Sequence, residues 1–248
     1  MFYIDILTIF PEMIDAYTQL SILGRAQKKK LLKIQAYNIR DYVLGKRKNV
    51  DDRPFGGGPG MVMQVLPFFN ALQSIKVIPR FSQKDLKKGL NKKKLVLDYT
   101  KIKNGRKKLK TRVILTSAKG KIFTQKDAYR LSKYDRLVFL CGRYEGVDER
   151  VAKYLVHEEI SVGKYVLTGG ELPALIISDA VSRLKDGVLG DKKSLKVESW
   201  EKENTVEYPQ YTRPDDFYNW KVPQVLLSGN HKEIEKWQKD NFYNLNND

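Results

Sequence analysis

The chain has 248 residues, of which 42% are apolar, enough for one large domain or for a main domain with a smaller one. The 46 Lys and Arg residues exceed the 29 Asp and Glu residues and give a formal net charge of +17. We therefore expect an anionic partner, and nucleic acid is favoured over a membrane surface. The alternative is that the basic faces are only solvated. The single cysteine excludes an intrachain disulfide and fits a reducing cytoplasm. The two histidines are far apart in the sequence, which disfavours a zinc site and a Ser–His–Asp or Cys–His hydrolase. No apolar stretch is long enough to span a membrane.

Strand and helix patterns alternate from the start of the chain. Met1–Thr8 alternates apolar residues as a strand does, and Asp5 within it argues against a signal peptide. Pro11 suits the first turn of a helix. The elements predicted next are a helix from Pro11 to about Leu20, a short helix over Ser21–Lys29, a strand over Leu32–Ile39, a loop from Arg40 to about Gly60 and a helix over Gln64–Ser74.

The alternation of strand and helix patterns resumes after a strongly basic stretch, Lys76–Lys110. We interpret this stretch as an insertion that is partly disordered or folded as a hairpin arm. Arg136–Cys141 is wholly apolar after its first residue, as expected for a strand inside a parallel sheet. The other predicted elements are a strand over Arg112–Ser117, a turn at Lys119–Gly120, a strand over Val156–Val162, and helices over Gln125–Lys133, Asp148–Leu155 and Glu171–Leu184. This order predicts an α/β fold whose parallel sheet is covered on both faces.

The C-terminal part of the chain has a different character. Residues 187–203 are polar with weak periodicity, which is typical of a linker. Apolar residues then gather in Val222–Gly229 and Glu233–Tyr243 and predict a small helical segment. We therefore expect a main α/β domain over 1–186, a linker over 187–203 and a helical C-terminal domain over 204–248.

Three glycine-bearing segments are candidates for ligand binding. Asp51–Met61 (DDRPFGGGPGM) has glycines that permit sharp turns or a close ligand, although it has neither the Walker A nor the dinucleotide-binding spacing. Cys141–Arg150 (CGRYEGVDER) follows an apolar strand, and ligands of open α/β sheets bind at that edge. Ser161–Pro173 (SVGKYVLTGGELP) can offer backbone groups to a ligand while its apolar side chains form the walls. The last two lie close enough in sequence to suggest one pocket.

These segments and several others together resemble the bacterial tRNA (guanine-N1)-methyltransferase family, TrmD, of the SPOUT class. The resemblance covers nearly the whole chain and rests on motifs in the same order: Phe10–Met13, Gly24–Ala26, Asp51–Met61, Cys141–Val151, Ser161–Ala174, Asp179–Arg183, Gly187–Gly190, Tyr211–Pro214 and Leu227–His231. It implies an α/β core with a C-terminal trefoil knot, which the patterns above do not predict, since knots are nearly absent from proteins. It also implies a homodimer that binds S-adenosylmethionine and tRNA, with no membrane or DNA partner.

The activity implied by the resemblance is methylation of N1 of guanosine 37, beside the anticodon of tRNA, with 1-methylguanosine and S-adenosylhomocysteine as products. The resemblance assigns the catalytic roles to Arg183 and to Glu198, which stands where the family has aspartate. It assigns cofactor binding to Leu115, Thr116, Ser117, Gly142, Glu145, Ser161, Val162, Gly163, Tyr165, Leu167, Gly169, Gly170 and Pro173. A carboxylate can remove the N1 proton and an arginine can stabilise charge at O6. No metal is needed for the transfer itself, and a magnesium requirement stays open.

The chain departs from the family at three places. Ser117–Gly120 lacks the usual Pro-Gln, the basic insertion is longer than usual, and position 198 is Glu rather than Asp. Two other functions remain as alternatives: a SPOUT methyltransferase for a different RNA, such as ribosomal RNA, and an RNA-binding protein without enzymatic activity. The Tyr211–Pro214 motif favours tRNA, and the retained glycines of the third segment favour a working cofactor pocket.

Overall fold

The computed structural model describes residues 1–43, 45, 47–79, 81, 103–104, 107–190 and 205–244. The chain divides into two compact units, Met1–Gly190 and Asp191–Asp248, which are described separately. No helix within the described ranges is long and apolar enough to cross a membrane.

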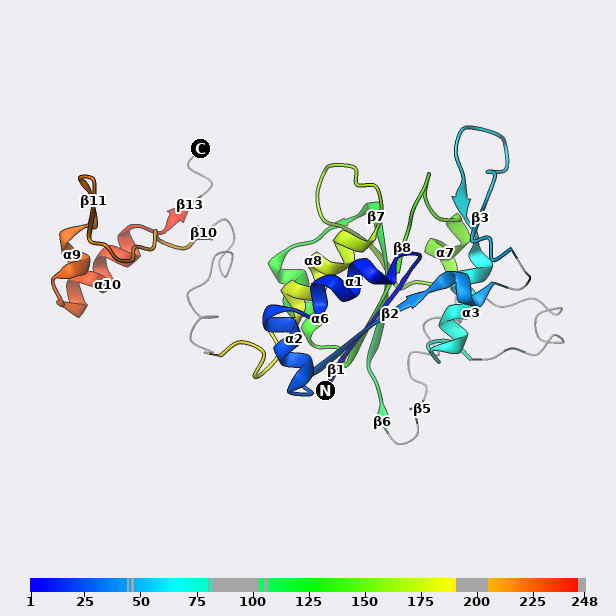
Figure 1. Cartoon of the computed structure of the whole chain (residues 1–248), viewed down its shortest axis with the longest axis horizontal. Coiled ribbons are helices and arrows are strands. Elements are labelled where there is room, and N and C mark those ends of the chain that lie inside the picture. The colour runs from blue at the N-terminus through cyan, green and yellow to red at the C-terminus, as the bar shows by residue number, and fades with distance from the viewer. Residues whose placement is uncertain are drawn as a thin grey trace. The chain divides into compact units, whose positions relative to one another are not determined.

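The first unit is built on a five-stranded sheet in which every neighbouring pair is parallel (Figure 1). Its strand order is β2-β1-β8-β7-β9. The strands are β1 (Phe2–Thr8), β2 (Leu32–Asn38), β7 (Thr111–Ile122), β8 (Arg136–Cys141) and β9 (Glu158–Ser161). Because β8 lies between β1 and β7 with all its residues buried, its continuous apolar run is explained by burial on both faces.

Helices cover both faces of this sheet. The helices α1 (Pro11–Thr18), α2 (Ser21–Lys28), α6 (Gln125–Ser132) and α8 (Glu171–Ser182) lie on one side in Figure 1. The helices α3 (Val65–Ser74) and α7 (Glu149–Tyr154) lie on the other, where the 3-10 helix Ile39–Tyr42 also contacts α3. The predicted α/β architecture with two covered faces is therefore confirmed.

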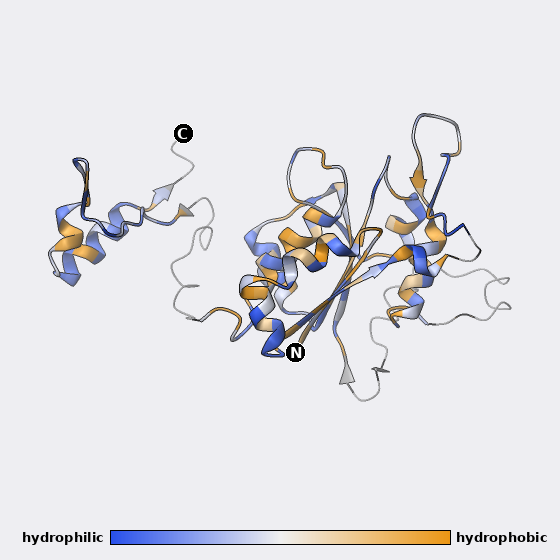
Figure 2. Ribbon diagram, viewed as in Figure 1, coloured by the Kyte–Doolittle hydropathy of each residue, from blue (hydrophilic) through white to orange (hydrophobic). Residues whose placement is uncertain are grey.

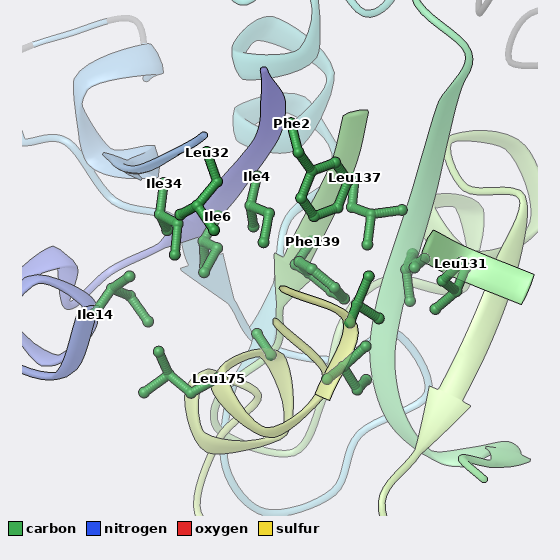
Figure 3. Packing of buried hydrophobic residues seen from close by; sticks show 14 of the residues in the cluster. Phe2, Ile4, Ile6, Ile14, Leu32, Ile34, Leu131, Leu137, Phe139 and Leu175 are labelled. Carbon is green, nitrogen blue, oxygen red and sulfur yellow. The ribbon is translucent and has the colours of Figure 1, made fainter. Parts of the chain in front are cut away.

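Side chains of β8 alternate between two hydrophobic clusters, one on each face. Phe139 packs in the cluster that includes Ile14 and Leu175 (Figure 3), whereas Leu140 packs in the cluster that includes Phe68. Figure 2 shows the hydrophobic residues gathered along the central strands and the helix stripes beside them. Full burial of a ring such as Phe139 contributes about 2–3 kcal/mol, so these clusters hold the strand ends in fixed positions.

The predicted turn at Lys119–Gly120 is wrong. Strand β7 continues through both residues to Ile122, and its register with β9 shifts between Thr116 and Lys121 as in a β-bulge. Gly120 faces the β9 backbone so closely that a Cβ there would lie 2.5 Å from the Ile160 nitrogen. The glycine therefore permits a close approach of two strands rather than a reversal of the chain.

The predicted loop from Arg40 to Gly60 also contains structure. It includes the short 3-10 helix Ile39–Tyr42 and β3 (Asp51–Asp52), which pairs antiparallel with β4 (Val62–Met63). Within the basic insertion, β5 (Lys103–Asn104) pairs antiparallel with β6 (Lys107–Lys108), in line with a hairpin arm. Most of the remaining insertion, and most of the predicted linker, lie outside the described residues.

Within residues 205–244, the part of the second unit that the structure describes, there are two short antiparallel strand pairs and two helices. Strand β10 (Thr205–Val206) pairs with β13 (Tyr243–Asn244), and β11 (Asp216–Phe217) pairs with β12 (Trp220–Lys221). The helices are α9 (Gln224–Leu227) and α10 (His231–Asp240). The Tyr208 ring makes edge contacts with Trp237 and Phe242, so aromatic packing joins the segments of this unit.

Candidate active site

A pocket of about 260 Å³ opens at the carboxyl edge of the sheet. It is lined by the middle of β7, the loop after β8 with residues of α7, and the end of β9 with the loop and first turn of α8. Ligands of open parallel sheets bind at this edge. The lining residues are Leu115, Thr116, Ser117, Ala118, Lys119, Gly142, Arg143, Tyr144, Glu145, Gly146, Val147, Glu149, Ala152, Glu159, Ile160, Ser161, Val162, Tyr165, Val166, Leu167, Thr168, Gly169, Gly170 and Pro173.

Backbone contacts hold the loop between β9 and α8 against the central strands. The Gly170 amide donates to the Gly142 carbonyl at 2.8 Å, and the Thr116 hydroxyl lies 3.1 Å from the Gly170 carbonyl oxygen. A Cβ on Gly170 would overlap the Thr116 hydroxyl and lie 2.9 Å from the Cys141 Cα. Only glycine fits here, so the start of α8 lies against the ends of β7 and β8.

A buried ion pair fixes the same junction. The Glu171 carboxylate is 1% exposed and accepts from the Thr8 hydroxyl at 2.6 Å and from Arg143 Nε at 2.9 Å. The Arg143 guanidinium also lies 4.7 Å from the centre of the Phe10 ring. Since Arg143 and Gly169 form an isolated antiparallel bridge, this ion pair connects β1, the loop after β8 and the loop before α8.

The only cysteine lies beside this junction without the properties of a nucleophile. Burial raises the pKa of Cys141 well above its ordinary value, and the nearby Glu171 carboxylate adds to the shift. The side chain is fully buried, so it stays a neutral thiol and packs as a small apolar residue.

The structure brings together nearly all the residues assigned to cofactor binding by resemblance. All of them except Gly163 line the pocket. Gly163 lies in the same loop, where its carbonyl accepts from the Ser161 hydroxyl at 2.9 Å. A Cβ on Gly163 would overlap the Tyr165 ring, so this glycine leaves room for Tyr165 to fold back over the loop. The sequence analysis missed Arg143, although its position between Gly142 and Glu145 could have indicated it.

Of the two residues predicted to be catalytic, Arg183 does not line the pocket. Arg183 caps the C-terminal end of α8, whereas Gly170 caps the N-terminal end beside the pocket. Thirteen residues at 1.5 Å each separate the two caps by about 20 Å. Glu198 lies outside the described residues. In this single chain, therefore, the pocket and Arg183 occupy opposite ends of one helix.

The solvent side of α1 and α8 carries an apolar surface. Tyr17 of α1 donates to the Asp179 carboxylate of α8 at 2.6 Å, which joins the two helices. The exposed apolar residues on these helices and the turn after α1 are Met13, Tyr17, Leu20, Leu172 and Ile176. Large apolar side chains gathered on one face are typical of a surface that another protein covers.

Three comparisons with known proteins agree on the family of the chain. The family model described as tRNA (Guanine-1)-methyltransferase TrmD matches residues 2–245. A tRNA (guanine-N(1)-)-methyltransferase of Dictyoglomus turgidum is 47% identical over 96% of this chain and 84% of its own, and one of Staphylococcus haemolyticus is 45% identical with the same coverage. The crystal structure of a tRNA (m1G37) methyltransferase from Aquifex aeolicus is 36% identical, with a TM-score of 0.70 over 95% of this chain and 87% of that chain.

Proposed function

This chain belongs to the tRNA (guanine-1)-methyltransferase TrmD family, and we propose that it methylates N1 of guanosine 37 in tRNA in the cytoplasm, with S-adenosylmethionine as the methyl donor. The observation that carries the proposal is the glycine-lined pocket at the carboxyl edge of the sheet. Twelve of the thirteen residues that resemblance assigns to the cofactor line it, and the relatives carry the same activity in their names. The net charge of +17 suits a tRNA substrate.

The pocket residues fit S-adenosylmethionine by their chemistry. Leu115, Val162 and Leu167 provide apolar walls for an adenine ring, and Glu145 provides a carboxylate for hydroxyl or ammonium groups. Bound there, the cofactor supplies an electrophilic methyl group, and the pocket orients it toward the second reactant. Tyr165 is 55% exposed at the mouth, where it can cover the bound molecule.

We further propose that the C-terminal part of the first unit forms the trefoil knot of the SPOUT class. The chain leaves the edge strand β9, passes through the loop before α8 and returns to hydrogen-bond with Gly142 next to the central strands. This return from the sheet edge to the loop after β8 supports a threaded connection. The knot would explain why the lining residues of the pocket come from several separate segments of the chain.

The catalytic pair is proposed to form across a homodimer. Arg183 lies about 15 Å along α8 from Pro173 of the pocket, too far for its side chain to reach a methyl group there. The apolar surface of α1 and α8 defined above fits a second copy of the chain, and a two-fold axis would supply Arg183 of the partner subunit to each pocket. Residues 187–203 then serve as a linker and 204–248 as the tRNA-binding domain.

Glu198 is proposed as the general base and Arg183 as the group that stabilises the developing charge at O6. Glu and Asp have similar acidities, so Glu198 is anionic at neutral pH like the aspartate it replaces. Removal of the N1 proton leaves negative charge that an arginine fork can bind. Glu198→Gln should abolish transfer with nearly unchanged tRNA and cofactor affinity, whereas Glu198→Asp should keep substantial activity. Near wild-type turnover by Glu198→Gln would move the role to Glu201, Glu203 or Asp191.

The direct test is methyl transfer to tRNA transcripts that differ only at guanosine 37 and its 5′ neighbour. Transfer that is lost when position 37 is changed supports the proposal, while transfer to ribosomal RNA fragments instead would favour the other SPOUT substrate. Absence of S-adenosylmethionine binding in calorimetry would favour an RNA-binding protein without activity. For the composite site, subunit exchange between inactive Arg183→Ala and Glu198→Gln proteins should restore part of the activity. No recovery despite proven exchange would contradict it.

A further inference from the structure

Phe55 lies in the loop that joins β3 to β4, and it is 100% exposed. Gly56, Gly57, Gly58 and Gly60 all have positive φ, between 77° and 118°. A Cβ on any of the first three would meet nothing within 4 Å. Gly56, Gly57 and Gly58 are therefore required by the left-handed backbone conformation and not by crowding. In this conformation the loop leaves the large apolar ring of Phe55 exposed to water.

The loop is anchored beside the pocket. The Glu145 amide donates to the Met61 carbonyl at 3.1 Å, and the Met63 amide donates to the Gly146 carbonyl at 2.9 Å. A Cβ on Gly60 would lie 2.6 Å from Glu145 Oε1. Glu145 and Gly146 line the pocket, so Phe55 stands only a few residues from its rim. In Figure 1 this loop projects from the same edge of the sheet as the loop between β9 and α8.

The surroundings of Phe55 favour a single flat partner over a protein surface. Its neighbours Arg53, Gly56, Gly57 and Gly58 are all exposed and not apolar, and the small, half-buried Pro54 precedes it. One isolated ring cannot provide the extended apolar core of a protein–protein interface. It can stack on an unpaired base, and Arg53 together with the net charge of +17 would attract the phosphates that accompany that base.

We propose that Phe55 stacks on an unpaired base of the tRNA anticodon loop next to the target guanosine. This inference rests on the proposed function. An enzyme that acts on a base edge must first take that base out of its stack, at a cost of a few kcal/mol. An aromatic ring that occupies the vacated place restores part of the lost stacking. Phe55 therefore holds the target guanosine in the extruded position, while the pocket holds the methyl donor.

The test compares Phe55→Leu, Phe55→Trp and wild type on tRNA with 2-aminopurine in place of the target guanosine, whose fluorescence rises when it leaves the stack. Phe55→Leu should lose most of the fluorescence rise and lower kcat/KM for ordinary tRNA by about tenfold, the value of one base–aromatic stack. Phe55→Trp should stay within about twofold. S-adenosylmethionine affinity should be unchanged in both. Tyr129→Leu, which makes the same kind of change at an exposed ring on α6, should behave as wild type.

An active Phe55→Leu protein with wild-type kcat/KM and fluorescence would overturn the stacking role. So would equal loss in Phe55→Leu and Phe55→Trp, or a loss of S-adenosylmethionine affinity, since either would mean that the residue shapes the loop and does not contact a base. If wild-type protein methylated no tRNA at all, the proposed function itself would fail, and the two failures are thereby distinguished.

Discussion

Gly170→Ala is expected to disable the pocket by adding one methyl group. The backbone at Gly170 has φ −85° and ψ −5°, which alanine adopts freely, so the whole effect is steric. The new Cβ overlaps the Thr116 hydroxyl and lies 2.9 Å from both the Cys141 Cα and the Gly142 nitrogen. Cys141 ends β8, all of whose residues are buried, and its backbone has no space into which it can move.

The magnitude follows from these contacts. Overpacking of a rigid interior costs about 1–3 kcal/mol. Displacement of the Thr116 hydroxyl from the Leu140 and Gly170 carbonyl oxygens costs about 1–3 kcal/mol more. Together they amount to about 2–6 kcal/mol, a large part of the ordinary 5–15 kcal/mol stability of a protein. We expect a lower midpoint of thermal unfolding and a loss of S-adenosylmethionine binding by calorimetry.

Two control variants separate this steric effect from a general effect of Gly→Ala. Gly190→Ala should leave folding and cofactor affinity unchanged, because a Cβ there meets nothing within 4 Å. Thr116→Ala combined with Gly170→Ala should recover part of the stability, since one of the overlapping atoms is gone. Wild-type unfolding and wild-type affinity in Gly170→Ala would refute the reasoning.

Three further changes probe other parts of the first unit. Glu171→Gln removes the buried charge beside Arg143 and should lower the free energy of unfolding by about 2–4 kcal/mol. It should also raise KM for S-adenosylmethionine more than KM for tRNA, and an unchanged ratio of the two KM values would contradict this. Burial and the nearby Arg112 lower the pKa of His157 to about 4. The free energy of unfolding present above pH 6.5 should therefore fall by on the order of 1–3 kcal/mol as the pH is lowered toward 4. His157→Asn keeps an acceptor for the Val113 amide and should reduce this fall, as measured by denaturant titrations at each pH. Shortening the basic insertion 76–110 should weaken tRNA binding and reduce its salt dependence without changing the target base; an altered target would show that it reads bases.

The elements that could be predicted from the sequence are those whose signal is local. Strand β8 was predicted with its observed bounds, because burial on both faces leaves an uninterrupted apolar run. The continuation of β7 through Lys119 and Gly120 could not be predicted, since these two residues look like a turn. The strand continues because Lys121 and Ile122, which follow them, pair with Ile160 and Ser161 of β9. A bulge is specified by its partner strand, which the local pattern does not contain.

In the candidate site, too, the features with a local sequence signal could be predicted, whereas the contacts between distant residues could not. Motifs identified the pocket loops, because glycines and apolar residues at strand ends are visible in the sequence. The ion pair between Arg143 and Glu171, and the bond from Thr8 to Glu171, join residues 28 and 163 positions apart. Nothing near Thr8 or Glu171 in the sequence indicates that they meet. Their contact follows from the order of the strands in the sheet.

The geometry of α8 sets the strongest constraint on the reaction. One helix carries Pro173, which lines the pocket, near its first turn and Arg183 at its last. A helix is rigid over twelve residues, so no local adjustment brings its two ends together. If both residues serve one transfer, the arginine must come from a second α8 lying alongside the first. The exposed apolar residues of α1 and α8 lie where such a helix could pack. The homodimer proposed above would then follow from the length of α8.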